Sequence, residues 1–110
     1  MRKIFLHLST AIVLGCVGVP STLRAESDPA KVYATNCALC HAANGSGDSA
    51  AGKALHAKDL RTAEVQAQSD AALAEIIGKG KGKMPAFAGK IPAVDLAKLA
   101  TYVRDMAKQK

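Results

Sequence analysis

The stretch Cys37-Ala38-Leu39-Cys40-His41 decides how the rest of this chain is interpreted. Two residues separate the thiols of Cys37 and Cys40, and the imidazole of His41 follows the second thiol directly. This is the spacing of c-type haem attachment, in which two sulfurs form thioethers with the two vinyl groups along one edge of the ring. The histidine then lies beneath the iron and is a potential axial ligand. The stretch therefore predicts a covalently bound haem.

Three other uses of paired cysteines remain open for the same stretch. A zinc site needs about four sulfur or nitrogen ligands, and beyond this stretch the chain after residue 25 adds only His56. A thioredoxin-type pair is expected to follow a strand within a strand-helix-strand pattern, which the sequence does not show. A structural disulfide is chemically possible, but it leaves the adjacent histidine unexplained. Haem attachment explains more of the sequence than any of these alternatives.

Residues 1–25 have the pattern of a secretory signal peptide. Arg2 and Lys3 form a basic start, residues 11–19 are apolar, and cleavage is expected after Ala25. The apolar stretch is too short for a convincing membrane-spanning helix, so no stable membrane insertion is expected after processing. An alternative remains, because residues 13–16 loosely resemble the box before a lipid-modified cysteine, here Cys16. The sequence thus predicts export to the periplasm or an equivalent compartment.

The chain beyond the signal peptide, residues 26–110, is long enough for one compact domain and too short for a separate catalytic domain. Cleavage removes three of the 15 basic residues and none of the nine acidic ones, so 12 basic and nine acidic residues leave a net charge of +3. The basic residues form no run with interleaved aromatics. This mild excess argues against nucleic acid as a partner.

The pattern of apolar residues predicts helices throughout, because they recur three and four positions apart without sustained strand alternation. A first helix is expected from Pro29, capped by Asp28, to about His41. A short turn is expected over 62–68, and a helix capped by Ser69 or Asp70 is expected to stop at Gly78. A last helix is expected over 92–107 with a buried stripe that comprises Leu96, Leu99, Ala100, Val103 and Met106. Residues 42–52 and 78–87 are expected to form loops.

The side chains after residue 25 offer little material for a hydrophobic core. They include no tryptophan, two tyrosines and a single phenylalanine, Phe87. A domain of this length with so few large apolar side chains is expected to be marginally stable. A planar macrocycle held between helices supplies the missing apolar volume.

With these residues, the chain resembles the class I c-type cytochromes, and the resemblance covers almost all of residues 30–107. The matching positions are Tyr33 and Asn36 before the attachment stretch, the stretch itself, residues 83–87 (Lys-Met-Pro-Ala-Phe), and Leu99, Tyr102 and Val103. The resemblance implies an all-α cytochrome c fold, with three to five helices wrapped around one haem c bound through Cys37 and Cys40. In that family the first and last helices cross.

The resemblance also implies two axial iron ligands, His41 from the attachment stretch and Met84 from a late loop. The sequence independently favours Met84, which stands in a glycine-rich loop before Pro85, whereas a core methionine usually lies on a helix stripe, as Met106 does. His56 is expected to be a surface residue. The chain departs from the family at one position. Many members have a proline soon after the attachment stretch, and its carbonyl accepts a hydrogen bond from the axial histidine. Here no proline follows that stretch until Pro85. A different backbone carbonyl must therefore accept a hydrogen bond from His41.

A methionine–histidine ligand pair fills both axial positions, which favours single-electron transfer between redox protein partners over catalysis. The expected protein is therefore an electron carrier, not an enzyme, and a monomer. Two alternatives remain open: a small haem peroxidase or gas-binding haem protein, and an electron-delivering subunit of a larger oxidoreductase complex. Four lysines near the expected ligand loop suggest docking to partners with acidic patches, although solubility explains them equally well: Lys79, Lys81, Lys83 and Lys90.

Overall fold

The computed structural model describes residues 27–109, so the expected signal peptide and Cys16 lie outside the described residues. Within that range the protein is all-α, and its only strand-like pairing is an isolated bridge between Lys81 and Met84. The helices are α1 (Pro29–Asn36), α2 (Ala38–His41), α3 (Ala50–Leu55), α4 (Ala63–Gln66), α5 (Asp70–Lys79) and α6 (Ala93–Lys108). No helix in this range is long and apolar enough to cross a membrane.

The first predicted helix is present but is broken at Cys37. It begins as expected, because the Asp28 carboxylate accepts a hydrogen bond from the Ala30 amide at 3.0 Å. Cys37 caps this helix and belongs to neither α1 nor α2, with φ −116° and ψ −37°, and a separate turn, α2, carries the rest of the attachment stretch. The expectation of one continuous helix to His41 was therefore wrong.

A helix replaces part of the loop that was expected over residues 42–52. The Ser49 hydroxyl caps this helix, α3, by accepting a hydrogen bond from the Gly52 amide at 2.9 Å. Small residues dominate the sequence of α3, so it has no apolar stripe from which a helix could be predicted. The break at Cys37 and the unexpected α3 together raise the number of helical segments in residues 27–109 above the three to five expected.

Helix α5 starts at its predicted cap but runs past its predicted end. Ser69 accepts a hydrogen bond from the Ala72 amide at 3.1 Å, as expected of an N-cap. Gly78, the expected stop, is instead buried within the helix, where its missing Cβ lets Leu96 of α6 approach. The helix ends at Gly80, whose φ of +74° suits glycine. Packing against α6, rather than local propensity, therefore decides that the helix ends at Gly80 and not at Gly78.

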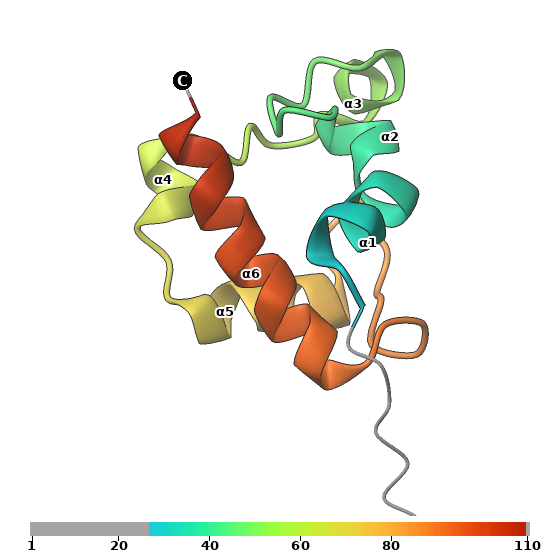
Figure 1. The fold of residues 1–110 in the computed structure, drawn as a ribbon. Coiled ribbons are helices and arrows are strands. Elements are labelled where there is room, and N and C mark those ends of the chain that lie inside the picture. The colour runs from blue at the N-terminus through green and yellow to red at the C-terminus, as the bar shows by residue number, and fades with distance from the viewer. Residues whose placement is uncertain (1–26, 110) are drawn as a thin grey trace, which may run out of the picture.

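Helix α6 runs across the whole domain and organises its packing (Figure 1). It contacts α5 along one side and α1 along the other, so the first and last helices pack together as the family resemblance implies. The predicted stripe is buried in full, with Leu99 only 1% and Ala100 0% exposed. Leu99 is also the only large described side chain less than 2% exposed. The core that the described residues form is thin, as expected from composition.

Candidate functional site

Cys37, Cys40 and His41 come together at the junction of α1 and α2. All three side chains are half-buried, and both cysteines are free thiols. Burial, with a smaller contribution from neighbouring Cys40, raises the pKa of the Cys37 thiol to about 11. Cys37 is therefore a protonated thiol near neutral pH. Such a thiol would supply the S–H that a thioether bond to a haem vinyl group requires.

Helix α3 packs against α2 through two small residues, Ser49 and Gly52. The Ser49 hydroxyl lies 2.6 Å from the Leu39 carbonyl oxygen and 3.1 Å from that of Cys40, and it donates to this pair. Gly52 sits so close that a Cβ there would overlap the carbonyl oxygens of Cys40 and Gly47. The attachment turn is thus fixed from the α3 side by contacts that admit no larger residue at position 52.

The hydrogen-bond partner of His41, which the missing proline left unidentified, is the backbone carbonyl of Lys58. The distance from His41 Nδ1 to that oxygen is 2.9 Å. A carbonyl oxygen only accepts, so Nδ1 carries the proton and donates. Nε2 is then the nitrogen with a free lone pair, the form in which histidine binds a metal. His41 is held in the tautomer that an axial ligand needs.

Met84 lies in the loop that follows α5. Its backbone pairs with that of Lys81 through hydrogen bonds of 3.0 and 3.1 Å, which close a tight turn. Gly80 permits this turn, since a Cβ there would lie 2.6 Å from the Met84 carbonyl oxygen. The Met84 side chain is half-buried and packs against the apolar cluster that includes Tyr33, Phe87 and Leu99. Cys37 packs against the same cluster.

These residues fit a haem c. Two thiols stand at one turn, an imidazole with a free Nε2 follows them, and a thioether sulfur is available from a distant loop. Cys37 and Met84, far apart in the sequence, meet on one buried apolar cluster, and neither side chain is fully covered by protein. Within residues 27–109 no group of three or more His, Cys, Asp and Glu side chains forms a metal site, so the zinc alternative gains no ligands there.

Tyr33 and Tyr102 join α1 to α6, as expected of helix-contact residues. Their ring centroids lie 5.3 Å apart with planes tilted by 53°. The Tyr33 hydroxyl also donates to the Ala42 carbonyl oxygen at 2.7 Å, just beyond the attachment stretch. Burial is the main reason that the pKa of Tyr33 is raised well above its usual value. The ring therefore stays neutral and acts as a structural link.

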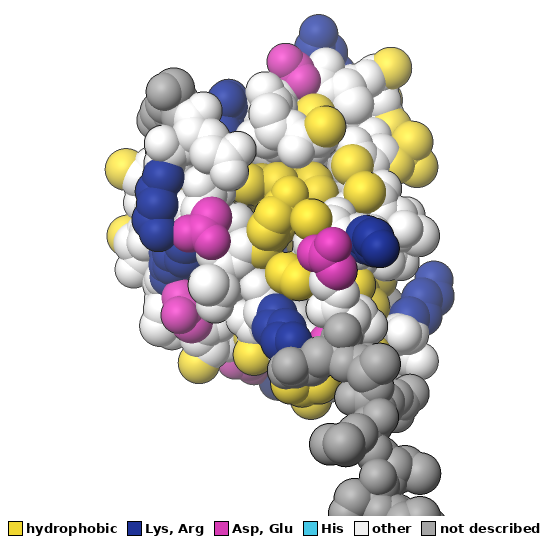
Figure 2. Space-filling view, in the orientation of Figure 1, with side chains coloured by type: hydrophobic (Ala, Val, Ile, Leu, Met, Phe, Trp, Pro, Cys, Tyr) yellow, Lys and Arg dark blue, Asp and Glu magenta, His cyan; other side chains and the backbone are white. Residues whose placement is uncertain are grey.

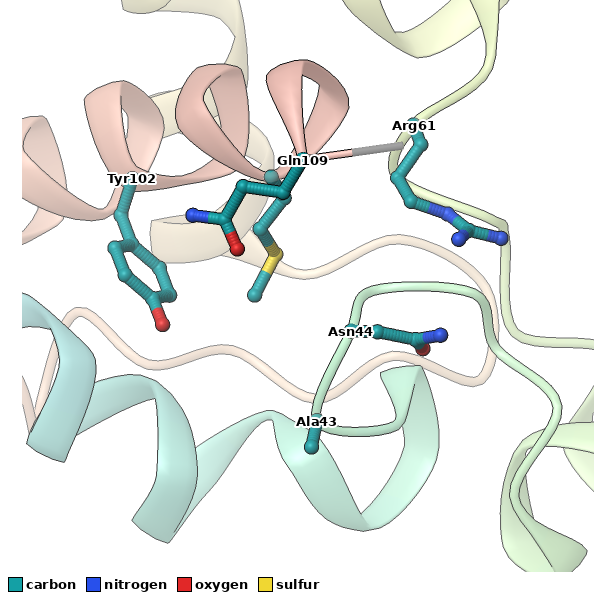
Figure 3. A pocket seen from close by; sticks show the side chains of 6 residues that line it. Ala43, Asn44, Arg61, Tyr102 and Gln109 are labelled. Carbon is teal, nitrogen blue, oxygen red and sulfur yellow. The ribbon is translucent and has the colours of Figure 1, made fainter.

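A small cavity lies between the end of α6 and the loop after α2 (Figure 3). Its volume is about 110 Å³, and it is lined by Ala43, Asn44, Arg61, Tyr102, Met106 and Gln109. Pockets for drug-sized ligands begin at about 300 Å³, so this cavity is too small for a haem. Arg61 is engaged with Asp59, its Nε lying 2.9 Å from the carboxylate.

The four lysines near the ligand loop are all exposed, but two of them have local partners. Lys79 forms an ion pair with Glu75 at 2.6 Å, and the Lys90 ammonium lies 6.0 Å from the centre of the Phe87 ring. Figure 2 shows one face on which apolar side chains gather at the centre while charged side chains of both signs surround them. His56 is exposed at the end of α3, in agreement with its expected surface position.

Three contributors to the site escaped the sequence analysis. Ser49 caps α3 and Gly52 lies within it, where a loop was expected over residues 42–52. The Lys58 carbonyl belongs to the backbone, which the sequence does not distinguish from any other carbonyl. The pair Gly47 and Gly52 within a stretch of small residues was the available signal, because closely spaced glycines often mark close backbone approach.

Comparisons with known proteins agree on one family. The family described as cytochrome C oxidase, cbb3-type, subunit III matches residues 24–103. Cytochrome c6 of Picosynechococcus sp. is 31% identical over 98% of this chain and 97% of its own length. Cytochrome c6 of Leptolyngbya boryana is 38% identical over 72% of this chain and 89% of its own. A solved structure, the KustC0563 c-type cytochrome, superposes with a TM-score of 0.67 at 30% identity, covering 73% of this chain and 98% of that one.

Proposed function

This chain belongs to the c-type cytochrome family, and we propose that His41 and Met84 are the two axial ligands of its haem iron. Its haem c is bound through Cys37 and Cys40. Its function is electron transfer rather than catalysis. The haem, when bound, supplies an iron that changes oxidation state by one electron. The protein's own residues hold that iron and keep both of its axial positions filled.

The observation that carries the ligand proposal is the hydrogen bond from His41 Nδ1 to the Lys58 carbonyl, 2.9 Å long. It fixes the ring orientation and the tautomer, and it increases the basicity of the coordinating nitrogen. Packing of Met84 on the cluster that Cys37 also contacts supports a sulfur ligand drawn from the Met84 loop. A thioether ligand favours ferrous iron and so raises the reduction potential above that of a bis-histidine site.

Filled axial positions predict that the reduced protein does not bind carbon monoxide rapidly. A gas-binding or peroxidase-like protein needs an open or easily vacated position on the iron, whereas a carrier does not. The test is to add carbon monoxide to the reduced wild-type holoprotein and follow the absorption spectrum over time. We expect no change on the timescale of mixing. Immediate complete conversion to a carbon monoxide adduct would contradict the ligation by Met84.

Export, a monomeric state and docking through lysines belong to the same proposal. The pattern of residues 1–25 supports secretion into the periplasm or an equivalent compartment, after which the domain begins near residue 26. Cytochrome c6 of Picosynechococcus sp. matches 98% of this chain and 97% of its own length, which supports a protein that works as a single domain. The matched family description names an oxidase subunit, and this supports a terminal oxidase as one candidate partner.

Replacing Lys81 and Lys83 with glutamine is expected to slow electron transfer to the physiological partner at low salt. Both side chains are exposed in the loop that carries Met84, and the ion pairs and ring contacts described above involve Lys79 and Lys90 instead. Long-range attraction to an acidic patch raises the encounter rate, and salt screens it. The bimolecular rate is expected to fall severalfold at low ionic strength, with a flatter salt dependence.

The matched control changes the same net charge elsewhere, with Lys31 on α1 and Lys53 on α3 replaced by glutamine. Both control lysines are exposed. A docking role for the Met84 loop requires the control to retain more of the wild-type rate and salt slope than the loop variant. Equal effects from the two variants would show that only net charge matters and would move the search for the docking surface to another face.

A further inference from the structure

We propose that Gly47 is a positioning residue that sets the reduction potential, because it leaves room for the backbone carbonyl that accepts the hydrogen bond of His41. The proposal rests on the proposed ligation of the iron by His41. Gly47 acts through the segment that contains Ala57 and Lys58, whose carbonyl oxygen lies 2.9 Å from His41 Nδ1.

The Lys58 carbonyl is held between two backbone tethers. On one side, the Ala57 amide donates to the Gly52 carbonyl at 2.8 Å. On the other side, the Leu60 amide donates to the Gly45 carbonyl at 2.7 Å. Both tethers end on the segment that directly follows the attachment stretch. The position of the acceptor relative to His41 is therefore determined by how closely these two segments approach each other.

Gly47 lies against the Ala57–Lys58 peptide. Its amide donates to the carbonyl oxygen of His41 at 2.9 Å, which ties it to the ligand's own backbone. A Cβ on Gly47 would lie 2.6 Å from the Ala57 carbonyl oxygen and 3.2 Å from that of Lys58. Both atoms belong to backbone that the two tethers restrain, so they cannot rotate away as the end of a side chain does. Any residue other than glycine must displace the Ala57–Lys58 peptide.

Displacement of this peptide weakens the hydrogen bond to His41 and makes its imidazole a less basic ligand. A less basic ligand stabilises ferric iron less, so the reduction potential rises. Loss of one such hydrogen bond changes an equilibrium constant by a factor of up to about ten. We therefore expect Gly47→Ala to raise the ratio of reduced to oxidised protein at a fixed applied potential by up to about tenfold, or about 59 mV for one electron.

The experiment compares Gly47→Ala with Gly89→Ala in the haem-bearing protein. Gly89 lies in the loop before α6, outside both tethers and outside the turn that carries Met84. A Cβ on Gly89 would meet nothing within 4 Å, whereas a Cβ on Gly47, whose φ is +73°, would meet the Ala57 carbonyl. We expect the potential to rise in Gly47→Ala and to stay at the wild-type value in Gly89→Ala.

A second readout reports the hydrogen bond itself. In the reduced protein, the His41 Nδ1 proton is observed by NMR with ¹⁵N-labelled histidine, and its exchange with solvent is expected to accelerate roughly fivefold in Gly47→Ala, the factor for losing about 1 kcal/mol. Where Gly47→Ala fails to mature, Ala57→Gly loosens the same segment without adding an atom, and the same direction of both changes is expected. A merely structural role for Gly47 moves neither readout.

The proposal is overturned by an unchanged potential and an unchanged Nδ1 proton in the Gly47 variant, or by equal shifts in both glycine variants. Failure of the underlying ligation has a different signature, because the wild-type protein would then lack the spectrum of a histidine-ligated low-spin haem. The two failures are therefore separated by the wild-type spectrum, which is recorded before any variant is compared.

Discussion

Cys37→Ala or Cys40→Ala is expected to reduce the yield of folded, haem-bearing protein by more than about tenfold. Of the large side chains in the described residues, only Leu99 is less than 2% exposed, and Cys37 packs against the same cluster. A domain with so thin a core depends on its cofactor for apolar volume, so attachment and folding are coupled. A loss of one or two kcal/mol already changes the folded ratio by a factor of about 5–30.

The measurement is the intact mass and helical circular dichroism of each variant, produced in a haem-attaching host. His41→Ala is expected to impair maturation as well, because it removes a proposed axial ligand of the iron. Cys16→Ala provides the matched control, since Cys16 lies outside the attachment stretch and within the proposed signal peptide. The same mass spectrum locates the mature N-terminus, expected after Ala25, and shows whether Cys16 carries a lipid. A folded cysteine variant with wild-type helicity and no haem would contradict the coupling.

Met84→Ala is expected to lower the reduction potential by on the order of 0.1 V, because axial ligands set haem potentials over a range of about 0.8 V. Loss of the sulfur removes the ligand that favours ferrous iron. It also vacates an axial position, so added carbon monoxide or imidazole is expected to bind within the mixing time. Both thioethers remain, and the intact mass should still include the haem. Voltammetry and ligand-binding spectra provide the two measurements.

A volume-matched pair separates ligation from packing. Met84→Leu keeps an apolar side chain of similar size but removes the sulfur, and Met106→Leu makes the same change in the buried stripe of α6, where Met106 is 5% exposed. Only the Met84 variant is expected to change the potential and to open the iron to ligands. Wild-type behaviour of Met84→Leu would show that the side chain packs near the haem without binding it.

The helices with a clear apolar stripe or a clear cap were the predictable part of the fold. The stripe of α6 and the N-caps Asp28 and Ser69 were all found where the sequence placed them. The end of α5 was misplaced, because the contact between Gly78 and Leu96 depends on a helix that is distant in the sequence. Helix α3 was missed because small residues without periodicity carry no local signal.

The sequence proposes the side chains of the candidate site, but it cannot identify the backbone groups that support them. The spacing of the attachment stretch and the position of Met84 before a proline in a glycine-rich loop are sequence signals. The structure places Cys37 and Met84 on one apolar cluster. The partner of His41 is a carbonyl oxygen, and every residue has one, so only the fold identifies Lys58. The family's usual proline is absent there, yet the hydrogen bond that it normally accompanies is present. Sequence identity at one position is thus a poor guide to backbone geometry.

The most direct test of the account is the absorption spectrum of the wild-type holoprotein, recorded in the oxidised and reduced states. The account predicts a c-type haem in which both cysteines form thioethers, low-spin iron in both states, and a weak red absorption of the oxidised protein that arises from methionine sulfur bound to iron. A high-spin spectrum, or a low-spin spectrum without the sulfur band, would contradict a single-electron carrier whose iron is held between His41 and Met84.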